Sequence, residues 1–162
     1  MSLFTDSLLI AWDRGLDYAQ KLVADLSEAQ MVVQPQEAMN HPAWILSHLN
    51  AYHPAMVAMI TGQPFEDPKD HPFGMLSKPE PEGSVYESKE ALIAAFEQGH
   101  DAVTYALKSA SDPDLEAAIT LERWQKPFPR VGDALAYIML LHEATHLGQL
   151  SAWRRVQGFP AV

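Results

Sequence analysis

Cysteine is absent from the 162-residue sequence. Disulfides, thiolate zinc sites and a protein thiol nucleophile are therefore all excluded. Basic residues are scarce, because 11 Lys and Arg stand against 21 Asp and Glu, which gives a net charge of −10. A charge of this sign is repelled by phosphate backbones and anionic lipids, so we expect neither a nucleic-acid partner nor a membrane partner.

Long hydrophobic runs are also missing. No segment approaches the roughly 18 uninterrupted apolar residues of a membrane span, and the first residues lack the basic start of a signal peptide. We therefore expect a cytoplasmic protein. The apolar content of 48% nevertheless excludes wholesale disorder, and the length suits one domain with a sizeable core, which we place at residues 1–162.

Apolar residues recur at helical spacing in four segments of the chain. These segments cover approximately residues 3–26, 40–60, 84–110 and 131–156. Asn40 is the expected N-cap of the second helix, and Pro54 should kink that helix or end it early. Residues 111–130 should be irregular, with a short extended piece at 118–123. The pattern predicts an all-α fold built as a four-helix bundle.

A long proline-rich connection separates the second and third expected helices. Five prolines fall between residues 64 and 81, and no regular element survives at that density. Connections of this length are uncommon in compact domains and are often functional lids or crossovers. Because a long crossover allows the next helix to run in either direction, the sequence leaves the topology of the bundle open.

Two histidines, His142 and His146, lie four residues apart in the last expected helix. That spacing leaves their side chains about 40° apart around the helix axis and one turn apart along it. Two imidazoles so placed can reach one metal ion. No His, Asp or Glu follows His146, so a third protein ligand has to come from earlier in the chain.

His48 is the best candidate for that third ligand. It lies within the second helix on an apolar strip with Trp44 and Tyr52. A single histidine on such a strip is more often a hydrogen-bonded core residue than a ligand. Three inward histidines, however, are costly to bury unless something coordinates them. We therefore predict a site of His48, His142 and His146 that binds one divalent metal, with zinc or nickel favoured and iron allowed.

The remaining histidines receive weaker assignments. His41 points the same way as His48 but lies too far along the helix to share its metal, although it could line the same cleft. His71, in the proline-rich connection, could reach the site as part of a lid. We expect His53 to face away and His100 to be exposed. Around the metal, Tyr52, Gln149 and Trp44 are candidates to orient ligands or to contact substrate.

Residues 142–146 also match the H-E-x-x-H pattern, in which Glu143 would be the general base of a zinc metallopeptidase. The longer forms of that motif fail, because no further His or Glu stands at the required place downstream. We expect Glu143 to face solvent or a dimer partner instead. A third alternative is a non-enzymatic metal-binding dimerisation module. No catalytic side chain can be named from the sequence.

Two short motifs together resemble the DinB-like (DinB/YfiT) superfamily. Residues 44–48 match its W-x-x-x-H element, and residues 142–149 match its late H-x-x-x-H-x-G-Q element. The order and spacing of the motifs extend the resemblance over essentially the whole chain. It implies a four-helix bundle with three histidines that bind a divalent metal, and a homodimer.

The resemblance also implies a class of activity. Characterised members include thiol-S-transferases that use bacillithiol or mycothiol and a mycothiol-dependent maleylpyruvate isomerase, and many other members are assigned only by similarity as metal-dependent hydrolases. We therefore expect a metal-dependent transferase or hydrolase that acts on a small-molecule substrate. Because the chain has no cysteine, a low-molecular-weight thiol would have to arrive as a cosubstrate.

Overall fold

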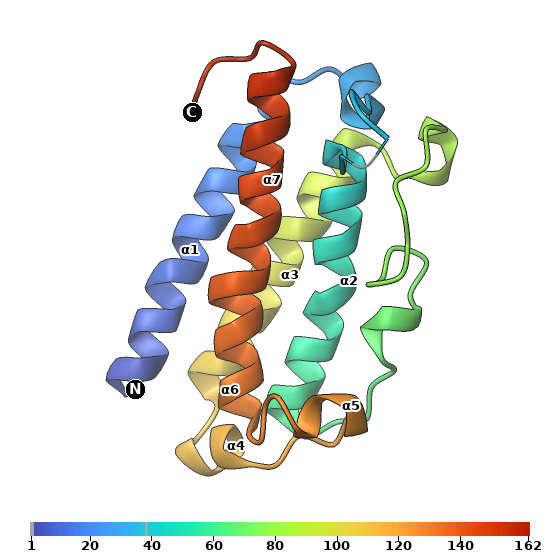
Figure 1. Cartoon of the computed structure of the whole chain (residues 1–162). Coiled ribbons are helices and arrows are strands. Elements are labelled where there is room, and N and C mark those ends of the chain that lie inside the picture. Colours follow the sequence, from blue (N-terminus) through green and yellow to red (C-terminus); the bar gives the residue numbers. More distant parts are fainter. Residues whose placement is uncertain (1, 38) are drawn as a thin grey trace.

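Four long helical segments make up most of the chain in the computed structural model, which describes residues 2–37 and 39–162. The first three are α1 (Leu3–Val23), α2 (Pro42–Thr61) and α3 (Lys89–Ser109). The fourth is continuous but changes its winding. It consists of α6 (Val131–Ala136), the π-helical η4 (Tyr137–His142) and α7 (Glu143–Val156). The predicted all-α four-helix bundle is confirmed (Figure 1).

The helix ends follow local capping chemistry. They correct the predicted N-cap of α2 and the early end that was one of the two outcomes expected at Pro54. The N-cap of α2 is His41 and not Asn40, because ring Nδ1 of His41 accepts the Trp44 backbone N–H at 3.2 Å. Pro54 does not end α2, which continues to Thr61 and stops at Gly62 with a left-handed φ of 67°. Such a φ is a conformation that glycine adopts without steric cost.

The bundle has two pairs of parallel neighbours. Both α2 and α3 begin at the end of the bundle where α1 finishes, so they run in the same direction, and α7 runs with α1 (Figure 1). Lys89, the first residue of α3, accordingly donates a hydrogen bond from Nζ to the Leu26 carbonyl oxygen beyond the end of α1. The short η1 (Glu28–Val32) connects α1 to α2. The topology that the sequence left open is thereby settled.

The connection between α2 and α3 is the long crossover that this topology requires. It runs back along the side of α2 and contains only the short 3₁₀ turns η2 (Pro68–Asp70) and η3 (Gly83–Val85), as its proline content predicted (Figure 1). At the end of the bundle where α2 and α3 finish, residues 111–130 are more ordered than expected (Figure 1). They form α4 (Asp112–Glu116) and α5 (Glu122–Gln125).

No extended piece forms at residues 118–123, so that prediction is wrong. The segment contributes only an isolated bridge between Ala118 and Arg130, followed by the start of α5. Before this segment, Ser111 and Asp114 form reciprocal hydrogen bonds that cap the short helix α4.

The hydrophobic core divides into two clusters along the bundle axis. One cluster surrounds Trp12 and Met56 towards the end closed by α4 and α5, and the other surrounds Leu22 and Trp153 towards the opposite end. The boundary between them is a level at which buried polar side chains meet. None of the helices among the described residues has both the length and the apolar character needed to cross a membrane.

Candidate metal centre

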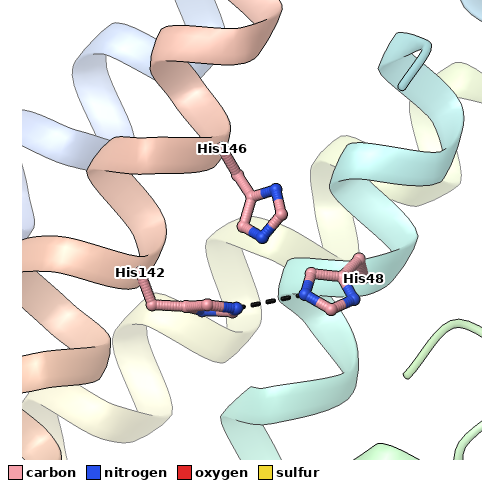
Figure 2. A group of neighbouring side chains, drawn as sticks. All are labelled: His48, His142 and His146. Atoms are coloured by element: carbon pink, nitrogen blue, oxygen red, sulfur yellow. Dashed lines mark hydrogen bonds between the residues drawn. The ribbon is translucent and has the colours of Figure 1, made fainter. Parts of the chain in front are cut away.

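The three histidines singled out in the sequence converge from two neighbouring helical segments. His48 projects from the middle of α2, while His142 ends η4 and His146 lies one turn later on α7 (Figure 2). One ring nitrogen from each lies within 4.8 Å of the others, and the Nε2 atoms of His48 and His142 are 3.1 Å apart. The helical spacing and the inward orientation therefore bring three imidazoles to one point.

Hydrogen bonds to the far side of two rings select the tautomer that a metal needs. Nδ1–H of His48 donates to the Phe73 carbonyl oxygen in the crossover at 2.6 Å. Nδ1–H of His146 donates to Oε1 of Gln149 at 3.1 Å, and that oxygen also accepts the side-chain N–H of Asn40 at 3.0 Å. Both imidazoles therefore present an unprotonated Nε2 to the centre.

Burial keeps the three imidazoles neutral. It lowers the pKa of His142 to about 3 and that of His146 to about 4, and the neighbouring imidazoles depress both pKa values further. The pKa of His48 is also lowered, mainly by burial. Neutral imidazole is the form that ligates metal, so protons compete little for these nitrogens at neutral pH.

The donor set fits a divalent cation. The lone pair of His48 Nε2 faces Nε2 of His142, while Nδ1 of His142 is buried without a hydrogen-bond partner in the described part of the chain. In the absence of a metal one hydrogen bond joins these two atoms, and a cation in the place of its proton would accept both Nε2 lone pairs. Three nitrogen donors with no thiolate or carboxylate suit zinc, nickel or iron and do not choose among them.

The histidines lie at the wall of a cavity of about 660 Å³ that opens on one side of the bundle. Trp44 stacks on His48 with ring centroids 4.7 Å apart, and the Tyr52 ring lies 4.6 Å from that of His142. Most of the remaining lining is apolar or aromatic and comes from the crossover, from α5 and the loop after it, and from η4. These further residues are Met75, Arg123, Trp124, Pro127, Phe128, Tyr137 and Ile138.

The sequence-predicted residues around the trio divide into two groups. Trp44 and Tyr52 line the cavity, whereas Gln149 lies outside it and bonds to Asn40 and to the far side of the His146 ring. His41 does not line the cavity, because its Nε2 is bonded to the Glu80 carbonyl oxygen at 3.0 Å while Nδ1 caps α2. His71 is exposed in the crossover and is not part of the cavity wall.

Two polar residues, His100 and Glu143, are buried where exposure was predicted, and His53, which was expected to face away from the site, is buried as well. His100 is only 2% exposed and Glu143 only 3%, and His53 is 4% exposed within the core. Their neighbours in sequence carried the signal, because His100 shares a helical strip with Phe96 and Val103, as Glu143 does with Leu147 and Leu150. The polar residues that flank His100 concealed that strip.

Glu143 is therefore not placed to act on the cavity beside the three histidines. Its Oε2 lies 2.9 Å from Nε2 of His100, and it borders a different surface cavity, between α1 and the segment formed by η4 and α7. Burial raises the pKa of Glu143 to about 9. The metallopeptidase interpretation of the H-E-x-x-H pattern at residues 142–146 therefore has no general base in the cavity.

The fold and the site define a class: an all-α bundle in which two helices present three neutral histidines to an open apolar cavity. A family model for the DinB superfamily matches residues 11–150, so the chain belongs to the DinB superfamily. Members of this superfamily are generally metal-binding enzymes, in agreement with the histidine cluster of this chain. Among curated proteins, none matches the chain.

Acid should destabilise the metal-free protein. Burial lowers the pKa of His53 and of His146 to about 4, and that of His142 to about 3, whereas the unfolded chain restores values near ~6.5. Between these limits the unfolded state binds more protons. The free energy of unfolding should then fall as pH drops from about 6.5 to about 4, by up to ~1.4 kcal/mol per pH unit for each histidine.

Glu143 opposes this trend, since a raised pKa favours the folded state at low pH, but one carboxyl acts against three imidazoles. Urea denaturation of chelator-treated protein at pH 7, 6 and 5 measures the dependence. A free energy of unfolding that stayed constant over that range would show that these histidines are not buried in neutral form.

Proposed function

We propose that this chain is a divalent-metal-dependent enzyme that transfers a low-molecular-weight thiol to a small, largely apolar substrate. The observation that carries the proposal is the trio of His48, His142 and His146 at the wall of an aromatic cavity large enough for a small molecule. Three protein ligands leave a coordination position free, which is typical of catalytic and not of structural metal sites.

The residues of the chain have separable roles in this proposal. His48, His142 and His146 would hold the metal, with the Phe73 carbonyl and Gln149 fixing the orientation of two of the rings. A cation bound there would act as a Lewis acid that lowers the pKa of a bound thiol or water. The aromatic wall would hold the apolar part of the substrate and exclude water from it.

The charge of the cavity wall favours a thiol over water as the nucleophile. None of the described residues that line the cavity is Asp or Glu, and the one cation on the wall, Arg123, is paired with Asp67. Without a carboxylate base, the nucleophile with the lower intrinsic pKa has the advantage, and a thiol is far more acidic than water. The chain has no cysteine, so the thiol comes from a cosubstrate.

Hydrolysis of a small molecule is the second candidate. Three neutral histidines are also the donor set that lowers the pKa of a zinc-bound water to near 7, which favours a hydrolase without a protein base. Peptide hydrolysis is disfavoured, since Glu143 is directed away from the cavity and the described residues near it offer no strand edge to bind an extended peptide.

Thiol dependence separates these reactions. We expect zinc- or nickel-loaded protein to conjugate an electrophilic aromatic probe such as 1-chloro-2,4-dinitrobenzene only when bacillithiol, mycothiol or glutathione is added. Chromatography of the conjugate measures the reaction, with the His48→Ala variant as background. Turnover of ester probes that needs no thiol would favour the hydrolase, and digestion of casein would favour the peptidase.

We further propose that the protein is a homodimer. Exposed apolar side chains occur on neighbouring segments, with Ile10 of α1 at 67% exposure and Leu141 of η4 at 57%. Sedimentation equilibrium should give twice the chain mass of 18.0 kDa, and Leu141→Glu should shift it towards the monomer. A monomer at micromolar concentration would contradict this proposal.

The cytoplasmic location, and the absence of nucleic-acid and membrane partners, stay predictions from charge and composition.

A further inference from the structure

A second cluster of potential ligands lies in the centre of the bundle, at the boundary between the two hydrophobic clusters. Each long helical segment contributes one side chain to it: Trp12 from α1, His53 from α2, His100 from α3 and Glu143 from α7. The last three are all buried, and one ligand atom from each lies within 4.8 Å of the others. None of them lines the cavity beside the first histidine trio.

The helices are shaped to admit these side chains. A Cβ on Gly15 of α1 would overlap the Oε1 atom of Glu143, and a Cβ on Gly99 of α3 would overlap the ring of His53. Trp12 supports the third member, since its indole stacks on the His100 ring at 3.7 Å and its Nε1 donates to the His100 carbonyl oxygen at 3.3 Å. Glycine is unfavourable within a helix, so its presence at both positions indicates a requirement for space.

The cluster has fewer hydrogen bonds than its buried polar atoms call for. His100 Nε2 and Glu143 Oε2 are 2.9 Å apart, but Nδ1 of His53 and Nδ1 of His100 have no partner among the described residues. Buried polar groups are normally hydrogen-bonded, and metal sites in bundle cores are built from His and Glu side chains on facing helices.

We propose that His53, His100 and Glu143 form a second divalent-cation site, distinct from the cavity and independent of the function proposed for it. Two imidazoles and one carboxylate suit Zn²⁺, Fe²⁺ or Mn²⁺, and the carboxylate offsets part of the charge of the ion in the apolar core. A cation held there joins α2, α3 and α7 through one atom.

The cluster lies behind two surface cavities. His53 borders a cavity of about 580 Å³ between α2 and α3, and Glu143 borders one of about 350 Å³ between α1 and the segment formed by η4 and α7.

Zinc stoichiometry tests the second site without altering it. Chelator-treated full-length protein is reloaded with Zn²⁺, desalted and weighed by native mass spectrometry. We expect two ions in the wild type and one in the His48→Ala/His146→Ala variant, which leaves the core cluster intact. His71→Ala, which changes an exposed histidine, is the matched control and should keep both ions. Zinc should also raise the Tm of the double variant.

A third substitution assigns the remaining ion. Adding Glu143→Gln, which preserves the size of the side chain, should abolish both the ion and the Tm increase, and His53→Gln in the same background should do the same. Complete loss of zinc from the His48→Ala/His146→Ala variant would overturn the second site and leave the first intact. An ion that persists in both triple variants would also overturn it, because that ion would lie elsewhere.

Discussion

His48→Ala is expected to lose the metal ion of the cavity and to lower kcat/KM for the thiol-transfer reaction by about 100-fold or more, equivalent to ~2.7 kcal/mol of transition-state stabilisation. His48 is the only one of the three histidines that comes from α2. Without it, the remaining pair would hold the ion with two nitrogens from one helical segment and no crosslink to the facing helix. Metal analysis and steady-state kinetics on the same preparation measure both effects.

A second, milder variant distinguishes the loss of a metal ligand from the loss of that ligand's orientation. Gln149→Ala removes the acceptor of the His146 Nδ1–H bond but no ligand, so metal affinity should fall by about 10-fold and activity should recover at high metal concentration. His71→Ala should change neither quantity. If His48→Ala retained a full complement of metal and wild-type turnover, the assignment of the trio as the metal centre would be wrong.

Trp12→Ala should produce the largest loss of stability, about 3–5 kcal/mol. The Trp12 side chain is 2% exposed, stacks on the His100 ring and donates a hydrogen bond to the His100 backbone. Its removal opens a large cavity at the level where the two hydrophobic clusters meet. Because whole domains are stable by only about 5–15 kcal/mol, this change is a substantial part of the total.

Urea denaturation at neutral pH measures this loss. Tyr105→Ala is the matched control, since Tyr105 is a large aromatic residue of α3 that is 77% exposed, and its removal should cost no more than about 0.5 kcal/mol. A Trp12→Ala variant within ~1 kcal/mol of the wild type would show that the indole does not fill the centre of the core.

The helices and the first histidine cluster could be predicted because both follow from local periodicity. Four amphipathic segments give four helices, and the spacing of His142 and His146 places both on one strip whichever neighbour that strip faces. His48 could be added because Trp44 and Tyr52 mark the buried strip of α2. These inferences depend only on the geometry of a single helix.

The topology and the core cluster could not be predicted in this way, because they depend on contacts between helices. The direction of α3 is decided by where the crossover ends, which the composition of residues 62–88 does not specify. The burial of His53, His100 and Glu143 depends on room that Gly15 and Gly99 provide on other helices. The sequence of one helix does not show which side chain of another helix packs against its glycine, because that depends on how the helices assemble.

The winding of the last helix was also hidden. The sequence predicted one uninterrupted helix over residues 131–156. The structure has a π-helical turn in Tyr137–His142 and presents two separate strips after it. His142 and His146 border the cavity, whereas Glu143 and Leu147 enter the core. Such π-helical turns are rare in proteins and often occur at functional sites.

Anomalous X-ray scattering from crystals of zinc-loaded protein tests the central assignment most directly. The predicted result is a peak at the zinc edge within about 2.0–2.1 Å of one ring nitrogen from each of His48, His142 and His146. Loaded protein with no peak beside these three rings, including a case in which zinc occupies only the core cluster of His53, His100 and Glu143, would contradict it.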